Sequence, residues 1–271
     1  MADKPSRALV IYGDGHANLV SPQHAHLHSF ATRASCGFLS LRAPTDAQES
    51  ENDRRIRELA QLLDAYDIYA ATKRENGKPN SKTDLKDSPA PTISQRFMGL
   101  RAAIFTTCPD VGSFATNLGL SVLKNSELIE QMNSDVDPLE VSDNNAIVSK
   151  FLKLLGFSGG EVLEKYDFDL VFLHITPSEK LKDEKGAKVI NTDVDFLNKL
   201  VGGLMHEAQP GSKVASRLHF SVVLGYGTIA DGSQNCSLIL NSAVETNSDL
   251  SLLRPHQSYT MKGGNILPDI R

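Results

Sequence analysis

Short apolar runs alternate with amphipathic segments along most of this chain. Four apolar runs, rich in β-forming residues, predict buried strands at 8–13, 100–107, 167–175 and 217–227. Segments with hydrophobic residues three or four positions apart predict helices at 50–66, 108–120, 145–157 and 193–208. Strands that alternate with helices are typical of βαβ units. The expected fold class is therefore α/β, with a mostly parallel sheet and helices on both faces.

Weaker patterns fill the intervals between these elements. We expect a helix from Ser21 as N-cap with Pro22 in its first turn, and a second strand at 37–42. A short strand and a further helix are expected after residue 120, and a last edge strand at 235–242.

Two stretches have no periodicity and are expected to be loops. One is the polar stretch 72–91, expected to be exposed and mobile, and the other is the acidic stretch 133–144. The whole chain, 1–271, is interpreted as one domain with a short decorated insertion at about 46–99.

Composition and charge narrow the class of protein. Hydrophobic residues make up 40% and charged residues 23% of the 271 positions, which is ordinary for a globular protein. No apolar run reaches the length of a membrane span, and the first residues lead directly into a strand without a signal-peptide pattern. Three widely spaced cysteines fit no zinc motif, and a net charge of -5 argues against a nucleic-acid surface. We expect a cytoplasmic or nuclear protein.

Asp14 is the first candidate functional residue. It follows the first predicted strand and lies between Gly13 and Gly15, where a ligand can approach the backbone closely. A carboxylate at the carboxyl end of a parallel strand is suited to metal binding or acid–base chemistry. The alternative is a turn aspartate that accepts hydrogen bonds from backbone amides.

The histidines and hydroxyl residues give weaker signals. His24, His26 and His28 are interpreted as surface residues, because a helical pair of histidines still needs a third ligand to hold a metal. His174 ends a buried strand, where it is either a functional group or simply a hydrogen-bonded side chain. Thr45 is placed as a possible nucleophile, without local support. The glycines at 156–165 follow a helix rather than a strand, so no phosphate-binding loop is predicted.

Three segments resemble one enzyme superfamily. These are "YGDGH" with "SPQHAHLHSFATRASCGFLSL", then "GLRAAIFTTCPDVGSFATNLGLSVL" at 99–123, and the strand, loop and helix at 166–205. Together they resemble the alkaline phosphatase superfamily, and most closely the archaeal-type cofactor-independent phosphoglycerate mutases. The resemblance implies an α/β core, two divalent metals held by Asp and His residues, and a Ser or Thr nucleophile.

The resemblance also implies that much of that site has been lost. Asp14 matches the first metal aspartate, and His256 matches the last metal histidine. Ser178 and Lys182 stand where an aspartate and a histidine ligand are expected, and Gly225-Tyr226 stands where an Asp-His pair is expected. The nucleophile motif has no counterpart, and Thr45 is the nearest candidate.

These losses predict a degenerate, non-catalytic domain without a cofactor, which acts as a protein-binding or scaffold subunit. The alternative is a metal-dependent phosphohydrolase or phosphomutase that uses Mn, Mg or Zn, with Asp14, His16, His174 and His256 as ligands. A small-molecule sensor, with Lys182 and Arg254 as anion contacts, is a third possibility. The first possibility implies a protein partner that the sequence does not identify.

Overall fold

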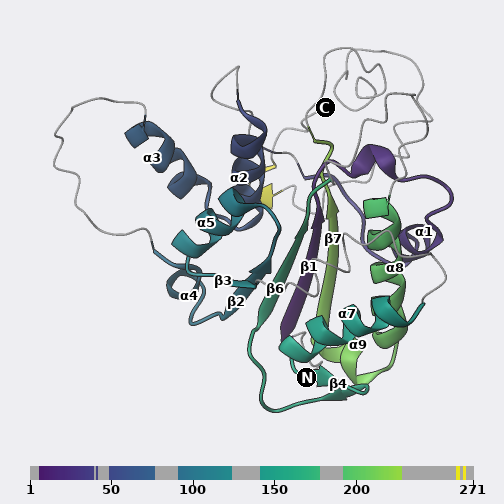
Figure 1. Ribbon diagram of the computed structural model, residues 1–271. Helices are drawn as coiled ribbons and strands as arrows, with labels where there is room; N and C mark the ends of the chain where they lie inside the picture. The colour runs from purple at the N-terminus through teal and green to yellow at the C-terminus, as the bar shows by residue number, and fades with distance from the viewer. Residues whose placement is uncertain are drawn as a thin grey trace.

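A five-stranded parallel sheet forms the centre of the computed structural model, which describes residues 6–39, 41, 49–76, 91–123, 141–177, 192–227, 261–262 and 265–266. The strand order is β3-β2-β6-β1-β7 (Figure 1). The strands are β1 (Arg7–Gly13), β2 (Ala102–Phe105), β3 (Ser121–Leu123), β6 (Leu170–Ile175) and β7 (Leu218–Leu224). All four pairings between them are parallel, which confirms the predicted fold class.

Helices cover both faces of this sheet (Figure 1). One face carries α2 (Glu51–Leu62), α3 (Tyr66–Asn76), α4 (Ile93–Arg96) and α5 (Pro109–Asn117). The other carries α1 (Ala25–Ala31), α7 (Val141–Leu154), α8 (Thr192–Glu207) and α9 (Lys213–Arg217). A 3-10 turn, η1 (Ala17–Leu19), precedes α1. Two short antiparallel strand pairs lie outside the main sheet. One is β4 (Phe157–Ser158) with β5 (Glu161–Val162), and the other is β8 (Met261–Lys262) with β9 (Asn265–Ile266). No helix in the described ranges is long and apolar enough to cross a membrane.

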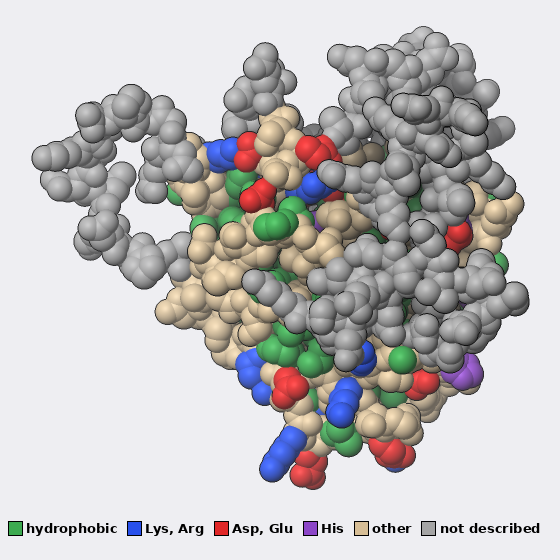
Figure 2. Space-filling view, in the orientation of Figure 1, with side chains coloured by type: hydrophobic (Ala, Val, Ile, Leu, Met, Phe, Trp, Pro, Cys, Tyr) green, Lys and Arg blue, Asp and Glu red, His purple; other side chains and the backbone are tan. Residues whose placement is uncertain are grey.

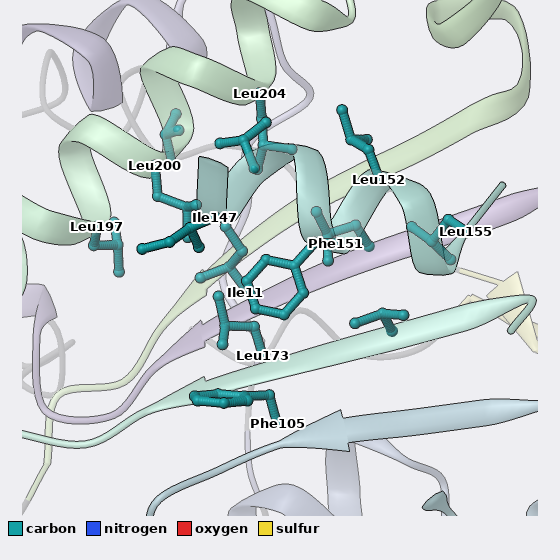
Figure 3. Packing of buried hydrophobic residues seen from close by; sticks show 14 of the residues in the cluster. Ile11, Phe105, Ile147, Phe151, Leu152, Leu155, Leu173, Leu197, Leu200 and Leu204 are labelled. Carbon is teal, nitrogen blue, oxygen red and sulfur yellow. The ribbon is translucent and has the colours of Figure 1, made fainter. Parts of the chain in front are cut away.

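The larger core lies between the sheet and the helices α7 and α8 (Figure 3). Ile11 of β1 and Leu173 of β6 point to this face, and Phe151 of α7 packs edge-on against Phe105 of β2. Leu197, Leu200 and Leu204 of α8 complete the layer, each with no exposed surface. Their spacing of three and four positions is the helical pattern that predicted the element.

A second core lies on the opposite face, under α2 and α5. Tyr12 and Phe172, which alternate with the residues of the first core along β1 and β6, point to this side and pack with Leu59 of α2. Because β1 and β6 are covered on both faces, their sequences are almost continuously apolar. This is why the sequence pattern identified them clearly.

Several local predictions are wrong. Residues 37–39 and 41 form no strand, and the side chains of Phe38 and Leu39 are 50% and 66% exposed. Helix α1 begins at Ala25 with His24 as its N-cap, later than the Ser-Pro pair predicted. The reason is that the backbone amide of Ser21 donates to Nδ1 of His24, which holds the preceding residues in a turn.

Two predicted loops are partly helical. Helix α3 continues through 72–76, and α7 already includes 141–144, so both helices extend into stretches that were predicted to be loops. The rest of both stretches lies outside the described residues, as do the helix expected after β3 and the strand expected at 235–242.

Candidate functional site at the carboxyl ends of β1 and β6

The loop after β1 is fixed by backbone hydrogen bonds to both neighbouring strands. The amide of Asp14 donates to the carbonyl of Ile175 at the end of β6, at 2.9 Å. The amide of Gly225, just after β7, donates to the carbonyl of Gly13, also at 2.9 Å. The loop therefore lies at the carboxyl edge of the sheet, where α/β proteins place their functional groups.

Glycines in this loop allow two turns to touch. Gly15 and Gly227 both have positive φ, 71° and 73°. A Cβ on Gly227 would lie only 3.0 Å from the Cα of Gly15. The space that the sequence suggested for an approaching ligand is therefore filled, on this side, by the backbone that follows β7.

The carboxylate of Asp14 is fully buried and engages two arginines. Nη2 of Arg54 donates to Oδ1 at 2.7 Å, and Nε of Arg55 donates to Oδ2 at 2.8 Å. Both arginines lie on α2, so each carboxylate oxygen has its own guanidinium partner. Asp14 is thus satisfied by side-chain ion pairs, rather than by the backbone amides of a turn.

Helix α2 carries further charges that hold these arginines in place. It begins after Ser50, whose side chain accepts from the amide of Asp53, and Glu51 in its first turn pairs with Arg54. Nη1 of Arg54 also donates to Oε2 of Glu58 at 2.8 Å, one turn further along. Burial alone would lower the pKa of Arg54, but its hydrogen bonds to Glu51 and Asp14 outweigh burial and raise that pKa.

Tyr12 connects this charge cluster to the sheet. Its hydroxyl donates to Oε2 of Glu58, and its ring is buried in β1. Burial, followed by the negative charges of Glu58 and Asp14, raises the pKa of Tyr12 well above its usual range. Tyr12 therefore remains a neutral hydrogen-bond donor at any physiological pH.

His174 lies directly against Tyr12 on the neighbouring strand. The two rings are stacked, with centroids 5.3 Å apart and an interplanar angle of 14°. Nδ1 of His174 is 2.9 Å from Oγ1 of Thr106, which also accepts the amide of Cys108. Burial lowers the pKa of His174 to about 4; Asp14 opposes this shift, and the two arginines reinforce it. His174 is therefore neutral at pH 7.

His16 is also completely buried beside this loop. Neither of its ring nitrogens has a hydrogen-bond partner in the described part of the chain, and Nε2 of His174 has none either. Burial lowers the pKa of His16, although the negative charge of Asp193 acts in the opposite direction. Two neutral imidazoles with three unsatisfied nitrogens thus lie near the Asp14 ion pairs.

The structure brings together three of the residues predicted to be functional. Asp14, His16 and His174 meet at the carboxyl ends of β1 and β6, close enough for the charge of Asp14 to act on both histidines. Thr45, Lys182, Arg254 and His256 lie outside the described residues. Within the described ranges, no group of three or more His, Cys, Asp or Glu side chains is arranged to hold a metal ion.

The three histidines predicted to be surface residues differ in exposure. His26 and His28 are exposed, as predicted, whereas His24 is buried, so the prediction of a surface residue is wrong for it. Nε2 of His24 lies 3.2 Å from Oδ1 of Asp195 on α8, and this contact attaches the start of α1 to that helix.

Sequence reasoning missed the partners of Asp14. Arg54, Arg55 and Glu58 were part of a predicted amphipathic helix without a role, and Tyr12 was only a strand residue. One local signal exists: charges of opposite sign at spacings of three and four, from Glu51 to Glu58, are typical of an ion-paired helix face. Nothing in that spacing indicates that the face turns toward Asp14.

No protein-family model, curated protein or solved structure matches this chain.

Proposed function

We propose that this chain is a non-catalytic, metal-independent relative of the alkaline phosphatase superfamily that serves as a protein-binding or scaffold domain. The observation that carries this proposal is the pair of ion pairs on Asp14. The residue that resembles the first metal aspartate offers no free oxygen, because Arg54 and Arg55 occupy both of them. The two guanidinium groups supply positive charge at the position where the resemblance implies a metal, and Glu51 and Glu58 hold Arg54 there.

Electrostatics opposes a metal ion at this position. Two unit charges 4 Å apart interact by roughly 4 kcal/mol at an effective dielectric constant of 20, and a dication doubles that value. A metal at Asp14 would meet this repulsion from both Arg54 and Arg55, reduced by the attraction of the neighbouring carboxylates of Glu51 and Glu58. It would also have to displace the two arginines from Asp14, and an unpaired buried charge is costly.

The surroundings of Gly225 support the same conclusion. The resemblance implies a metal-binding aspartate at this position. A Cβ on Gly225 would lie 3.2 Å from the hydroxyl of Tyr12 and 3.5 Å from Oε2 of Glu58. The hydrogen-bonded pair of Tyr12 and Glu58 therefore occupies the space into which an aspartate side chain would extend.

An exposed apolar segment supports a role in protein binding. Phe38, Leu39 and Leu41 follow α1 and are 50%, 66% and 39% exposed. Single exposed apolar residues are normal on protein surfaces, but three within four positions form a contiguous candidate contact.

The absence of catalysis is tested by metal analysis and an activity assay. We expect purified protein to contain no stoichiometric metal, to bind Mn²⁺ and Zn²⁺ only weakly in calorimetry, and to leave p-nitrophenyl phosphate intact in their presence. Two ions per chain with micromolar affinity would overturn the proposal.

The scaffold role is tested by comparing three proteins in affinity purification with quantitative mass spectrometry. We expect one partner, present in amounts comparable to the bait, to purify with the wild type and to be lost from the double variant Phe38→Ser, Leu39→Ser. Met98→Ser is the matched control, because Met98 is a fully exposed apolar residue on another part of the surface. Equal recovery of every protein with all three baits would contradict a role for this segment.

One observation favours a second candidate, a metal-dependent phosphohydrolase or phosphomutase. The three unpartnered ring nitrogens of His16 and His174 lie near Asp14, and buried polar atoms without partners require an explanation, such as an ion or a water molecule. This alternative requires hydrolysis of p-nitrophenyl phosphate that is lost with a chelator and in Asp14→Ala. Wild-type protein without turnover in the presence of Mn²⁺, Mg²⁺ or Zn²⁺ would exclude it.

A further inference from the structure

A hollow lies at the opposite edge of the sheet, near the amino end of β1. Its volume is about 460 Å³, and it is bordered by the start of β1, by α9 and by the residues around β5. Figure 2 shows basic and acidic side chains interspersed at the lower end of the molecule, where Figure 1 places β4 and α9. The charged residues that line the hollow are Arg7, Glu164, Lys213 and Arg217.

Arg7 is a buried cation in the wall of this hollow, with only 7% of its surface exposed. Its Nη1 donates to the carbonyl of Gly156 at 3.0 Å, and its Nη2 donates to the carbonyl of Leu163 at 2.8 Å. The guanidinium carbon lies 4.0 Å from the ring centroid of Tyr166 and 5.0 Å from that of Phe157. These four contacts fix the guanidinium in position, and all of them are with neutral groups.

The other two buried arginines in the described ranges have carboxylate partners. Arg54 pairs with Asp14 and Glu58, and Arg57 pairs with Glu49 at 2.7 Å. Arg7 has no carboxylate within ion-pair distance among the described residues, and its Nε is buried without a hydrogen-bond partner. Buried charges in proteins are normally paired, and among the described residues no carboxylate neutralises the positive charge in the wall of the hollow.

Helix α9 adds two more cations to the same hollow. Lys213 and Arg217 are four positions apart, which places them on one face of the helix, and both line the hollow. The ammonium of Lys213 lies 2.6 Å from Oε2 of Glu161, but both side chains are more than 60% exposed. Exposed pairs of this kind are weak, so Lys213 can exchange this partner for a ligand. Glu164 is the only acidic residue among the described residues that line the hollow.

We infer that this hollow binds a small molecule through an oxyanion, either a phosphate or a carboxylate group. Arg7 supplies a fixed positive charge in the wall, and Lys213 and Arg217 supply charged donors from α9. The apolar side chains of Val162 and Leu163 form another part of the lining and suit a short apolar portion of the ligand. This site lies at the edge of the sheet away from Asp14, so it does not depend on the function proposed above.

Thermal unfolding and calorimetry with inorganic phosphate and with acetate test this inference. Sodium chloride at equal ionic strength is the reference for both anions. We expect saturable binding and a raised melting temperature, and the anion that binds more tightly identifies the ligand group. In the double variant Lys213→Gln, Arg217→Gln, we expect the dissociation constant to rise at least about tenfold, because two charged donors are removed.

Arg33→Gln is the matched control, since it removes an exposed positive charge at the end of α1 and is expected to bind as the wild type does. If the double variant does not fold by circular dichroism, the single variant Lys213→Gln replaces it, because that side chain is 66% exposed. The inference fails if neither phosphate nor acetate binds or raises the melting temperature more than sodium chloride does. It also fails if the Lys213 variant binds the anion as tightly as Arg33→Gln does.

Discussion

Nε of Arg55 donates to Oδ2 of Asp14 at 2.8 Å, although the two residues are 41 positions apart in the sequence. This contact, with its neighbour from Arg54, joins α2 to the loop after β1. A residue that resembles a metal ligand thus serves here as an anchor for a helix.

Replacing Asp14 by asparagine is expected to destabilise the fold strongly. The amide keeps the shape of the side chain but removes the fully buried carboxylate shared by Arg54 and Arg55. Arg54 then keeps only Glu51 and Glu58 as counter-charges, and Arg55 keeps only Glu51. Removal of one partner from a buried ion pair costs about 3–5 kcal/mol. Urea denaturation followed by circular dichroism measures the loss, since the chain contains no tryptophan. Asp195→Asn is the control, because its pair with His24 is half exposed and should cost less than about 1 kcal/mol. Equal losses in the two variants would contradict the structural role of Asp14.

Replacing Tyr12 by phenylalanine isolates the hydrogen bond to Glu58. The ring and its stacking on His174 are retained, while Oε2 of Glu58 keeps only its bond from Arg54. We expect a loss of about 1–3 kcal/mol in the free energy of unfolding, because a partly satisfied buried carboxylate remains. Phe172→Tyr is no control here, because it does not change the hydrogen bond to Glu58. The appropriate control is the double variant Tyr12→Phe, Glu58→Gln, compared with each of the two single variants. A double variant that loses the sum of the two single losses would indicate that the two residues do not interact.

The stability of the protein is expected to fall as the pH is lowered. The pKa of His174 is about 4 in the folded protein, below the value of about 6.5 for an unfolded histidine. Between these two values the unfolded chain binds a proton that the folded chain does not bind. The free energy of unfolding therefore falls as the pH drops from about 6.5 to about 4, by up to about 1.4 kcal/mol per pH unit for this residue. The lowered pKa of His16 acts in the same direction.

Denaturation at about pH 7, 6 and 5 measures this slope. His174→Gln removes the titrating group and should flatten the dependence, even though it also lowers stability at pH 7. His28→Gln is the control, because His28 is exposed. An unchanged slope in His174→Gln would assign the effect to other groups.

Two glycines with nearly the same backbone conformation separate steric clash from dihedral strain. Gly119 and Gly160 have φ of 80° and 78°. A Cβ on Gly119 would lie 2.7 Å from the Cβ of Thr92, whereas a Cβ on Gly160 has nothing within 4 Å. We expect Gly160→Ala to cost about 1–2 kcal/mol, which is the price of a left-handed alanine. Gly119→Ala should cost at least about 1 kcal/mol more, because Thr92 must move and its capping box begins α4. Thermal or urea unfolding measures the stability lost in each variant. Equal losses in Gly119→Ala and Gly160→Ala would contradict the close contact between Gly119 and Thr92.

The elements that the sequence predicted well are those buried on both sides. The runs at β1 and β6 are apolar because helices cover both faces of the sheet, so composition alone identifies them. The segment at 37–42 has the same kind of composition, but in the described residues it pairs with no strand, and Phe38 and Leu39 remain exposed. Composition indicates which residues can form a strand, whereas the available sheet edges decide which do.

The candidate site was predicted only in part, for a related reason. Asp14 and His174 were found because each ends a buried strand, and such positions are local features. Their partners come from distant elements: Arg54 is 40 positions from Asp14, and Thr106 is 68 positions from His174. His24 was misjudged for the same reason, since its partner Asp195 is 171 positions away. Pairings of this kind depend on the three-dimensional arrangement and leave no periodic trace in the sequence.

The strand order has a consequence for the synthesis of the protein. Strand β1 is synthesised before the other strands of the sheet. Its two neighbours, β6 and β7, begin only at residues 170 and 218. At 5–20 residues per second, this apolar segment emerges from the ribosome and waits roughly 10–40 s for its partners. During that interval both of its hydrogen-bonding edges are open to strands of other nascent chains, so chaperone capture of the β1 segment should decide how much protein matures.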